Sequence, residues 1–226
     1  MTACLNECVQ WALLSGLTEA ERDEVVALGR RRSFARNEVV CHLGDPADSF
    51  HLVERGRLGV KVALPSGDEA MINVLGPGGS FGELALVRAD GHRTATIVAL
   101  EEATTLAVPG STFRMLCRRK PEFQAAVTEM LADRVDELSR LLLEGMYFTF
   151  DRRLQLCLTR LAAAYGSGAG TVSIPLTQSQ LAAMTGGTRP TVNLALQKLS
   201  EQGIVRLTRG RIEITDLRRL QAKVRT

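Results

Sequence analysis

FGELALVRADGHRTAT, at residues 81–96, sets the carboxylate of Glu83 and the guanidinium of Arg93 among glycines and apolar residues. A bound phosphate needs amide donors and a cation, whereas a sugar hydroxyl needs an acceptor. If Gly82-Glu83-Leu84-Ala85 begins a short helical turn, its free N–H groups point at an anion, and the glycine lets the backbone approach closely. These residue types at this spacing predict a site for a sugar with a phosphate beside it.

Each polar side chain of this stretch has a role in such a site. The guanidinium of Arg93 can bind two phosphate oxygens at once, and Thr94 can add a hydroxyl donor. Glu83 can accept a hydrogen bond from the sugar, and apolar surroundings strengthen both contacts. The alternative is an ion pair between Glu83 and Arg93 across the loop, although buried pairs stabilise poorly unless further hydrogen bonds satisfy them. The pattern favours a ligand and leaves the ion pair open.

The sequence around this stretch, from about 33 to 109, alternates short apolar runs with Gly, Pro, Asp and Asn. The runs at 50–53, 58–64 and 70–75 predict strands, and Pro65-Ser66-Gly67-Asp68 predicts a hairpin turn. Many short strands with glycine turns favour a barrel or jelly roll over a parallel sheet.

Two amphipathic helices are predicted on either side of the strands. Residues 17–32 form the first, with Thr18 and Glu21 in the positions of a capping box. Residues 121–145 form the second, which is much longer than the globular mean. Its apolar stripe consists of Val127, Leu131, Val135, Leu138 and Leu142. The stripe is heptad-like, and the length of the helix favours a coiled-coil dimer seam, with packing on the chain's own domain as the alternative.

The last third of the sequence predicts a helix-turn-helix. Thr177 and Gln180 form a capping box before a short helix, which a glycine pair ends. Thr188 caps a second helix, whose first turn accepts Pro190 because backbone amides there lack intrahelical partners. The buried stripe of this second helix consists of Val192, Leu196 and Leu199.

Further elements complete a winged helix. An amphipathic helix at 151–165 precedes the helix-turn-helix. Two short strands at 204–207 and 212–214, joined by a turn at Arg209-Gly210, form the wing. Asp216 then caps a last basic helix.

Charge is distributed unevenly along the chain. Residues 151–226 hold twelve Lys/Arg and four Asp/Glu, a net of +8, so the remaining residues carry −5 of the total of +3. This asymmetry indicates a polyanionic partner for the last third of the chain. A solvated basic face is an equally good explanation of charge alone.

The cysteines and the first residues indicate the compartment. The five cysteines are odd in number and show no CxxC spacing, which argues against a disulfide framework and favours a reducing cytoplasm. The first residues lack a basic segment followed by a long apolar run, so we expect no signal peptide and no membrane span.

FGELAL, followed after six residues by RTAT, resembles the phosphate-binding cassette of cyclic-nucleotide-binding domains. The order of predicted elements resembles the cAMP receptor protein/FNR (CRP/FNR) family of bacterial transcription regulators over nearly the whole chain. The resemblance implies an α+β fold with three parts. These are an N-terminal cyclic-nucleotide-binding β-roll (jelly roll) domain at 1–120, a dimerisation helix at 121–147 and a C-terminal winged helix-turn-helix DNA-binding domain at 148–226.

The resemblance implies a role for each residue of the cassette. The glutamate, here Glu83, takes the ribose 2′-hydroxyl, and the arginine, here Arg93, pairs with the cyclic phosphate. The site is completed by Thr94 and by amides near Gly82, Leu84 and Ala85.

The long helix of cAMP-responsive members carries a threonine and a serine that read the adenine, and these align with Leu138 and Ser139. The serine is present here and the threonine is absent. The resemblance therefore implies cAMP as ligand, with cGMP, another ligand or ligand-independent action as alternatives.

The recognition helix departs from the family pattern as well. The common Ser-Arg-Glu-Thr-Val-x-Arg reads TRPTVNL here, at 188–194. Arg189 can still make the bidentate contact with a guanine edge that the family pattern implies, worth roughly 1–3 kcal/mol of discrimination. Pro190 removes a carboxylate that would accept from cytosine, and Leu194 removes a second arginine, so we expect a different operator.

The resemblance divides the expected DNA contacts into two groups. The recognition-helix group is Thr188, Arg189, Pro190, Thr191 and Asn193. The group expected on phosphates, which position a protein without reading sequence, is Lys198, Arg206, Arg209 and Arg211.

Some family branches use cysteines for an iron–sulfur cluster or a histidine for haem. Cys4 and Cys8 have no close third cysteine, so we expect no cluster. His51 is expected to be a packed strand residue and His92 to lie on the cassette loop. We therefore expect no metal.

The resemblance implies a homodimeric, cytoplasmic regulator without catalytic activity, which binds double-stranded DNA and RNA polymerase and no membrane. Ligand in the β-roll would reposition the helix-turn-helix on a two-fold operator. An enzyme is the rival class, yet the sequence has no Ser/His/Asp set, metal-ligand cluster or Walker loop. A kinase-type regulatory subunit would carry the cassette without needing a winged helix. Specific, salt-sensitive DNA binding separates these classes.

Overall fold

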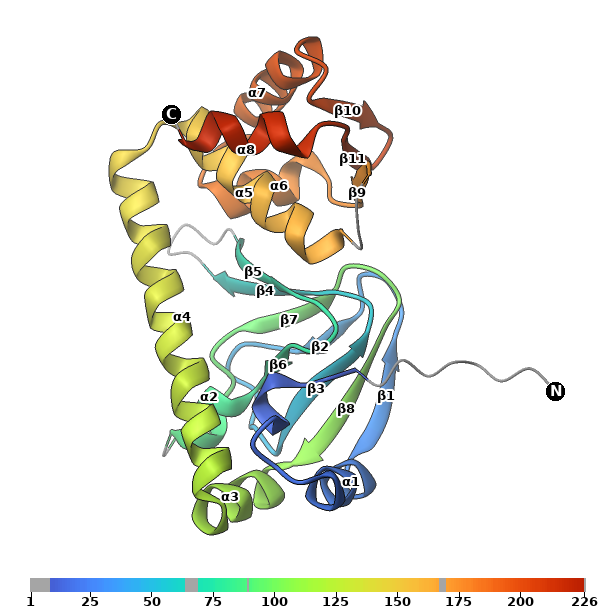
Figure 1. The fold of residues 1–226 in the computed structure, drawn as a ribbon, viewed down its shortest axis with the longest axis vertical. Helices are drawn as coiled ribbons and strands as arrows, with labels where there is room; N and C mark the ends of the chain where they lie inside the picture. Colours follow the sequence, from blue (N-terminus) through green and yellow to red (C-terminus); the bar gives the residue numbers. More distant parts are fainter. Residues whose placement is uncertain (1–8, 64–68, 89, 167–169, 226) are drawn as a thin grey trace, which may run out of the picture. The chain divides into compact units, whose positions relative to one another are not determined.

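A computed structural model of the chain describes residues 9–63, 69–88, 90–166 and 170–225 (Figure 1). The chain divides into two compact units, Met1–Leu58 with Leu75–Arg134 and Gly59–Val74 with Val135–Thr226. The long helix α4 (Pro121–Tyr147) contributes its first half to one unit and its second half to the other.

Short strands form two four-stranded sheets, of orders β1-β8-β3-β6 and β2-β7-β4-β5. The strands of the first sheet are β1 (Arg30–Phe34), β8 (Ala103–Pro109), β3 (Ser49–Arg55) and β6 (Ser80–Phe81). The strands of the second are β2 (Val39–Cys41), β7 (Thr96–Ala99), β4 (Leu58–Ala63) and β5 (Glu69–Leu75). The strands predicted at 50–53, 58–64 and 70–75 are therefore confirmed as β3, β4 and β5. The turn predicted at 65–68 lies outside the described residues.

The central strand β3 separates two different environments. Side chains alternate between the faces of a strand, so Phe50 and Leu52 face one way while Ser49 and His51 face the other. Phe50 belongs to an aromatic cluster, with ring centroids 5.2 Å from Phe113, which is itself 5.6 Å from Phe123. This places the apolar core of the first unit under two helices, α3 (Gly110–Arg119) and the start of α4.

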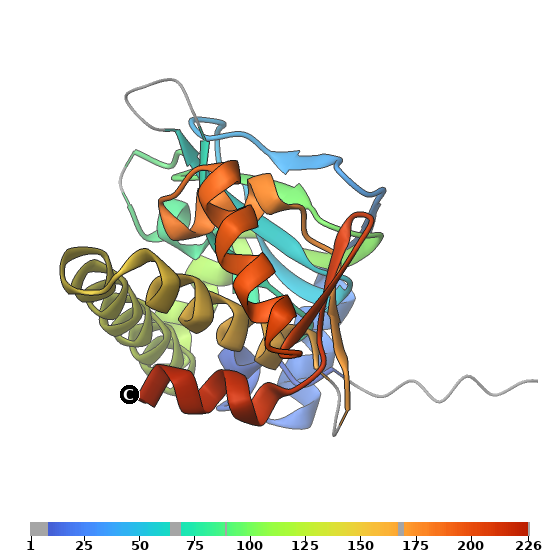
Figure 2. The same cartoon turned by 90° about the horizontal axis from the view of Figure 1, so that it is seen from above.

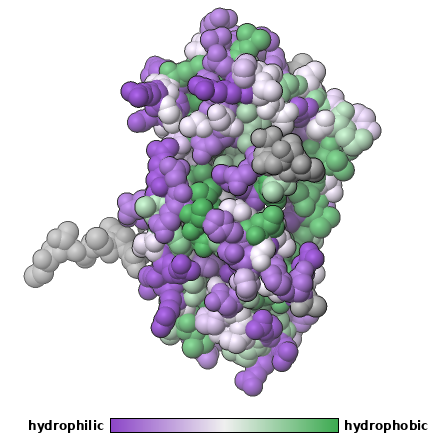
Figure 3. All heavy atoms as spheres, turned by 180° about the vertical axis from the view of Figure 1, so that it is seen from behind, coloured by the Kyte–Doolittle hydropathy of each residue, from purple (hydrophilic) through white to green (hydrophobic). Residues whose placement is uncertain are grey.

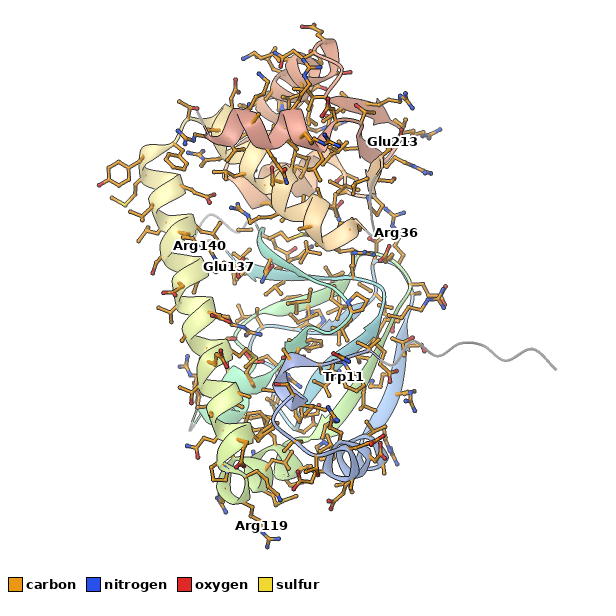
Figure 4. All side chains as sticks on the ribbon, in the orientation of Figure 1. Trp11, Arg36, Arg119, Glu137, Arg140 and Glu213 are labelled. Carbon is orange, nitrogen blue, oxygen red and sulfur yellow. The ribbon has the colours of Figure 1, made fainter. Side chains whose placement is uncertain are left out.

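The N-terminal helices cover the same core. Trp11, labelled in Figure 4, directly precedes the short helix η1 (Ala12–Leu14). Its indole N–H donates to the carbonyl of Val53 at 3.1 Å. The next helix, α1 (Glu19–Leu28), begins with the predicted capping box between Thr18 and Glu21.

Helix α1 ends four residues earlier than the predicted 17–32. Arg30, Arg31 and Arg32 belong instead to β1, an edge strand that pairs antiparallel with β8. Their side chains are exposed, and an edge strand accommodates such charges well. Non-local pairing with β8 therefore overrides the local helical pattern.

The apolar stripe of α4 divides between two environments. Phe123 and Val127 are buried in the first unit, whereas Val135, Leu138 and Leu142 are 56–63% exposed. The first half of the helix therefore packs on its own domain, as the alternative prediction had it. The second half exposes its apolar residues within the described structure, and the coiled-coil dimer seam stays a prediction for that half. Glu137 and Arg140 lie on this second half (Figure 4).

The C-terminal part of the chain folds as the predicted winged helix. Its helices are α5 (Phe150–Tyr165), α6 (Gln178–Thr185), α7 (Arg189–Glu201) and α8 (Leu217–Arg225). Its sheet has the order β10-β11-β9 and consists of β10 (Val205–Thr208), β11 (Arg211–Ile214) and β9 (Val172–Ile174). Figure 2 shows the hairpin of β10 and β11 beside α7. Strand β9 was not predicted, because three residues carry too little alternation to be recognised.

The predicted caps of these helices are confirmed. The Thr177–Gln180 capping box opens α6, and Gly186 ends it in the left-handed region with φ +63°. The hydroxyl of Thr188 accepts from the amide of Thr191 at the start of α7, and Asp216 accepts from the amide of Arg219 in α8. Val192 and Leu196 are fully buried, as the predicted stripe requires.

Hydrophilic and hydrophobic residues are interspersed on the face that Figure 3 shows. Within the described ranges, no helix combines the length and apolar character needed to cross a bilayer.

Candidate functional site

The predicted cassette begins with a short helix, α2 (Glu83–Val87). Gly82 precedes it with φ +96°, a conformation that favours glycine. A Cβ added at this glycine would overlap Nη1 of Arg93. The glycine therefore allows the arginine to lie against the backbone at the start of α2.

The carboxylate of Glu83 is buried, with 1% of the residue exposed. One oxygen, Oε1, forms an ion pair with Nη1 of Arg134 from α4, whose Nη2 donates to the carbonyl of Ser80 at 2.9 Å. The other oxygen, Oε2, is buried and has no hydrogen-bond partner among the described residues. Glu83 is thus held in position with one acceptor free.

The guanidinium of Arg93 is also buried, with 6% of the residue exposed. Its Nη2 donates to the hydroxyl of Ser49 at 3.3 Å and lies 4.0 Å from Oδ1 of Asp48. Its Nη1 is buried without a partner within the described part of the chain. The arginine is thus tethered on one side and free on the other.

The ion pair between Glu83 and Arg93 that the sequence left open is not what the structure contains, because Arg134 pairs with Glu83 instead. Arg134 was missed at the sequence level. It is one of several charges on the long helix, and its contact with Glu83 spans 51 residues. No local pattern distinguishes it.

The two orphaned atoms test whether a cyclic nucleotide suits the site. A buried polar group without a partner costs about 1–3 kcal/mol, so such groups call for an explanation. A sugar hydroxyl would satisfy the acceptor on Glu83, and a phosphate oxygen would satisfy the donor on Arg93. The residues present therefore fit the group.

The remaining predicted cassette residues differ in exposure. Ala85 is buried and Leu84 is 37% exposed. Thr94 is half-buried. They lie in and after α2, and the amides at the start of a helix lack intrahelical partners.

The two residues predicted to read the base lie on α4. Leu138 is one helical turn beyond Arg134 and is 56% exposed. The hydroxyl of Ser139 donates to the carbonyl of Val135 at 2.8 Å, so its proton is used within the helix. The oxygen of Ser139 can still accept a hydrogen bond.

The predicted recognition helix α7 presents Arg189, Pro190 and Thr191 as exposed residues in its first turn. The hydroxyls of Thr188 and Thr191 lie 2.8 Å apart. Asn193 is half-buried, and its Oδ1 accepts from Nε2 of Gln178 on α6 at 3.0 Å. Asn193 therefore links the two helices, and the second lone pair of its oxygen can still accept a hydrogen bond from a base.

The predicted phosphate contacts fall into two groups. Lys198 pairs with Asp151 at 3.2 Å. Arg206 pairs at 3.4 Å with Glu213 of the wing, a residue labelled in Figure 4. Arg209 and Arg211 are exposed at the wing turn. An anion would have to compete with a carboxylate at the first two cations.

Of the described cysteines, Cys157 is buried, whereas Cys41 and Cys117 are half-buried. Burial raises the pKa of Cys41 and of Cys117, and raises that of Cys157 to about 12. Cys4 and Cys8 lie outside the described residues. Within the described ranges, no group of three or more His, Cys, Asp or Glu residues is placed to hold a metal ion.

Comparison with known families assigns both halves of the chain. Residues 31–120 match the cyclic nucleotide-binding domain, and residues 152–223 match the Crp-like helix-turn-helix domain. The first match contains Glu83 and Arg93, and the second contains α6, α7 and the wing.

Individual relatives match over most of their length. The chain is 28% identical to a CRP-like cAMP-activated global transcriptional regulator of Mycobacterium tuberculosis, over 85% of this chain and 87% of that protein. It is 29% identical to the cyclic AMP receptor protein of Thermus thermophilus, over 90% and 92% respectively. The crystal structure of the Thermus thermophilus catabolite activator protein superposes with a TM-score of 0.52 at 29% identity, covering 94% of this chain and 98% of that one. The chain therefore belongs to the CRP/FNR family of transcription regulators.

Proposed function

We propose that this chain is a homodimeric transcription regulator that binds cAMP in the first unit and a two-fold DNA operator through α7. The family supports a cyclic-nucleotide-responsive DNA-binding regulator. One observation carries the ligand assignment: a buried acceptor on Glu83 and a buried donor on Arg93 both lack partners in the described structure. A ribose hydroxyl and a cyclic phosphate are complementary to these two atoms.

The relatives favour cAMP over other cyclic nucleotides. The Mycobacterium tuberculosis relative is cAMP-activated by name, and the Thermus thermophilus relative is a cyclic AMP receptor protein. The side chain of Leu138 cannot hydrogen-bond to a base, so of these two residues only Ser139 would do so. The chain would therefore discriminate adenine from guanine less strongly than a protein with the threonine, and cGMP is the alternative ligand.

Arg134 provides a route from the ligand to α4. The ribose hydroxyl would bind the carboxylate that Arg134 already holds, so ligand binding acts on a side chain of the long helix. The same helix continues into the exposed stripe of Val135, Leu138 and Leu142, which would form the dimer seam. A ligand shifts such an equilibrium only by its difference in affinity for the two states. We infer that cAMP favours the pairing of α4 in which the recognition helices match the operator.

The operator contacts follow from the exposed first turn of α7. Arg189 would bind a guanine edge in the major groove, worth roughly 1–3 kcal/mol of discrimination. Two recognition helices of a dimer must lie about 34–36 Å apart to enter successive major grooves. The basic wing residues would contact phosphates, and the dimer would act on transcription in the cytoplasm through RNA polymerase.

Two measurements on the purified full-length chain test this function together. Calorimetric titration with cAMP and separately with cGMP should give micromolar binding for at least one nucleotide. A DNA selection from random duplexes, repeated with and without that nucleotide, should return a two-fold sequence only in its presence. Binding of neither nucleotide would overturn the ligand assignment. Nucleotide binding without any enriched DNA sequence would favour a regulatory subunit instead.

A further inference from the structure

His51 is a buried titratable residue that the proposed ligand site does not use. It lies on β3, is 2% exposed, and stacks on Phe81 with ring centroids 4.6 Å apart and an angle of 12° between the rings. Its Nδ1 lies 3.0 Å from the hydroxyl of Thr105, a fully buried residue of the neighbouring strand β8. Burial, followed by the charges of Arg93 and Arg32, lowers the pKa of His51 to about 3. The imidazole is therefore neutral at physiological pH and rigidly held.

Ser49 connects this imidazole to the phosphate-binding arginine. It lies two residues before His51 on β3, so both side chains are on the same face of the strand. The Ser49 hydroxyl lies 3.4 Å from Nε2 of His51 and accepts from Nη2 of Arg93 at 3.3 Å. The same hydroxyl donates to Oδ1 of Asp48 at 2.9 Å.

Counting protons gives this chain of contacts a direction. Ser49 has one proton to donate, and the carboxylate of Asp48 is a nearer and stronger acceptor than the imidazole. The neutral imidazole must then carry its proton on Nε2 and donate it to Ser49. Its Nδ1 consequently accepts the hydroxyl proton of Thr105. Among the side chains of this set, Nη1 of Arg93 is the buried atom that lacks a hydrogen-bond partner in the described part of the chain.

We propose that Ser49 is a positioning residue for the ligand phosphate: His51 and Thr105 hold its hydroxyl so that Arg93 is tethered by Nη2 and keeps Nη1 free. We call Thr105, His51 and Ser49 the relay. This inference rests on the proposed binding of a cyclic nucleotide and names residues outside the cassette motif that set its affinity.

The tether matters because an arginine side chain is flexible. Ordering a rotamer-rich side chain on binding costs about 0.5–1.5 kcal/mol, and a residue already held in the bound orientation avoids that cost. The exposed carboxylate of Asp48, 4.0 Å from Nη2, competes for the same guanidinium. Without Ser49, Arg93 would be freer to turn toward Asp48 and away from the ligand.

The test compares full-length variants by calorimetric titration with cAMP and with cGMP. We expect Ser49→Ala to weaken nucleotide binding about tenfold and Thr105→Val about threefold, whereas Ser49→Thr restores affinity to within a factor of two of wild type. Thr104→Val is the matched control, because its side chain lies on the opposite face of β8 and should leave affinity unchanged. Thermal unfolding of each variant checks that the fold is retained.

Two spectroscopic readouts separate positioning from a general structural effect. In the wild type, 15N spectra of the His51 ring should show a neutral, Nε2-protonated imidazole at pH 7. The 31P shift of bound nucleotide should differ between Ser49→Ala and the wild type and coincide in Thr104→Val. Equal affinity in Ser49→Ala and wild type would overturn the relay while leaving the proposed function intact. If the wild type bound neither nucleotide, both the relay and the proposed ligand-binding function would be overturned.

Discussion

Two arginines are expected to bind the two ligands of this protein, and their surroundings are opposite. Arg93 is 6% exposed, is tethered by Ser49, and keeps one buried nitrogen without a partner in the described structure. Arg189 is exposed in the first turn of α7. The first has been desolvated by folding, whereas the second would be desolvated only when DNA arrives.

This difference determines what each site needs from the rest of the fold. A buried charge is tolerated only where other groups hold and satisfy it, so the site of Arg93 depends on residues from several distant strands. An exposed arginine needs only a helix that presents it. We expect substitutions around Arg93 to act cooperatively and those around Arg189 to act nearly independently.

The largest expected effect tests the buried side of the comparison. Arg93→Ala should weaken nucleotide binding more than 100-fold, roughly 3 kcal/mol, because charge-assisted hydrogen bonds to the phosphate are lost in a buried site. Arg88→Ala, which removes an exposed arginine paired with Asp90 at 3.1 Å, is the matched control and should change affinity little. Calorimetric titration of both variants measures the difference. Equal losses in the two variants would refute the site.

The next effect concerns the imidazole behind Arg93. Because folding lowers the pKa of His51 from 6.5 to about 3, the unfolded chain takes up a proton below pH 6.5 that the folded chain does not. The contribution of His51 to the free energy of unfolding is thus fully present above pH 6.5 and is lost as the pH falls toward 3. Between pH 7 and pH 5 the loss should be about 2 kcal/mol of unfolding free energy.

Denaturant unfolding at both pH values measures this loss, and the variant His51→Gln should lack it. Thr104→Val, on the opposite face of β8 from Thr105, provides the control and should retain the wild-type pH dependence. An unchanged pH dependence in His51→Gln would show that the imidazole is not held neutral by the fold.

The third prediction concerns the exposed arginine. Arg189→Ala should reduce the discrimination between the selected operator and a duplex in which the contacted guanine is replaced, by about 1.5 kcal/mol. Arg218→Ala removes one exposed charge from α8 and is the control for electrostatic attraction. Titration of both duplexes at a fixed salt concentration distinguishes the two variants. If Arg189→Ala weakened binding to all duplexes equally, base readout by this residue would be excluded.

A smaller effect is expected for the base of the nucleotide. Leu138→Thr should strengthen cAMP binding by about 1 kcal/mol, the typical net value of one hydrogen bond. The gain for cGMP should be smaller. Leu142→Thr alters a similarly exposed leucine one turn further along α4 and should have no such preference. Competition between the two nucleotides measures the change. The same gain in both variants would mean that residue 138 does not contact the base.

The smallest effect compares two cations of the DNA-binding part. Arg211→Ala should lower the slope of log affinity against log salt by about 1, as expected for the loss of one phosphate contact. Lys198→Ala should lower it by less, because Lys198 already pairs with Asp151 at 3.2 Å. In a protein that carries Asp151→Asn, Lys198→Ala should then lower the slope by about 1, as Arg211→Ala does. A larger effect of Lys198 than of Arg211 would reverse this assignment.

Sequence patterns predicted the helices and caps of this protein well, because those signals are local. The capping boxes at Thr18 and Thr177 and the cap at Thr188 each depend on residues within one helical turn. The same local reasoning extended the first helix through Arg30–Arg32, where pairing with β8 decided otherwise. It also missed β9, whose partner β11 follows much later in the chain.

The candidate ligand site divides in the same way. Gly82, Glu83 and Arg93 were predicted because they lie close together in the sequence and their residue types suit a sugar phosphate. Arg134 and Ser49 were not, because they reach the cassette from residues 51 and 44 positions away.

The sequence by itself determined the family, the order of elements, and the carboxylate and arginine that a sugar phosphate needs. Only the tertiary structure decided that Glu83 pairs with Arg134 rather than with Arg93. It also decided that Glu83 and Arg93 each keep one buried atom without a partner among the residues that the structure describes. The physical reason is that residue types set which hydrogen bonds can form, whereas burial and distance decide which ones do.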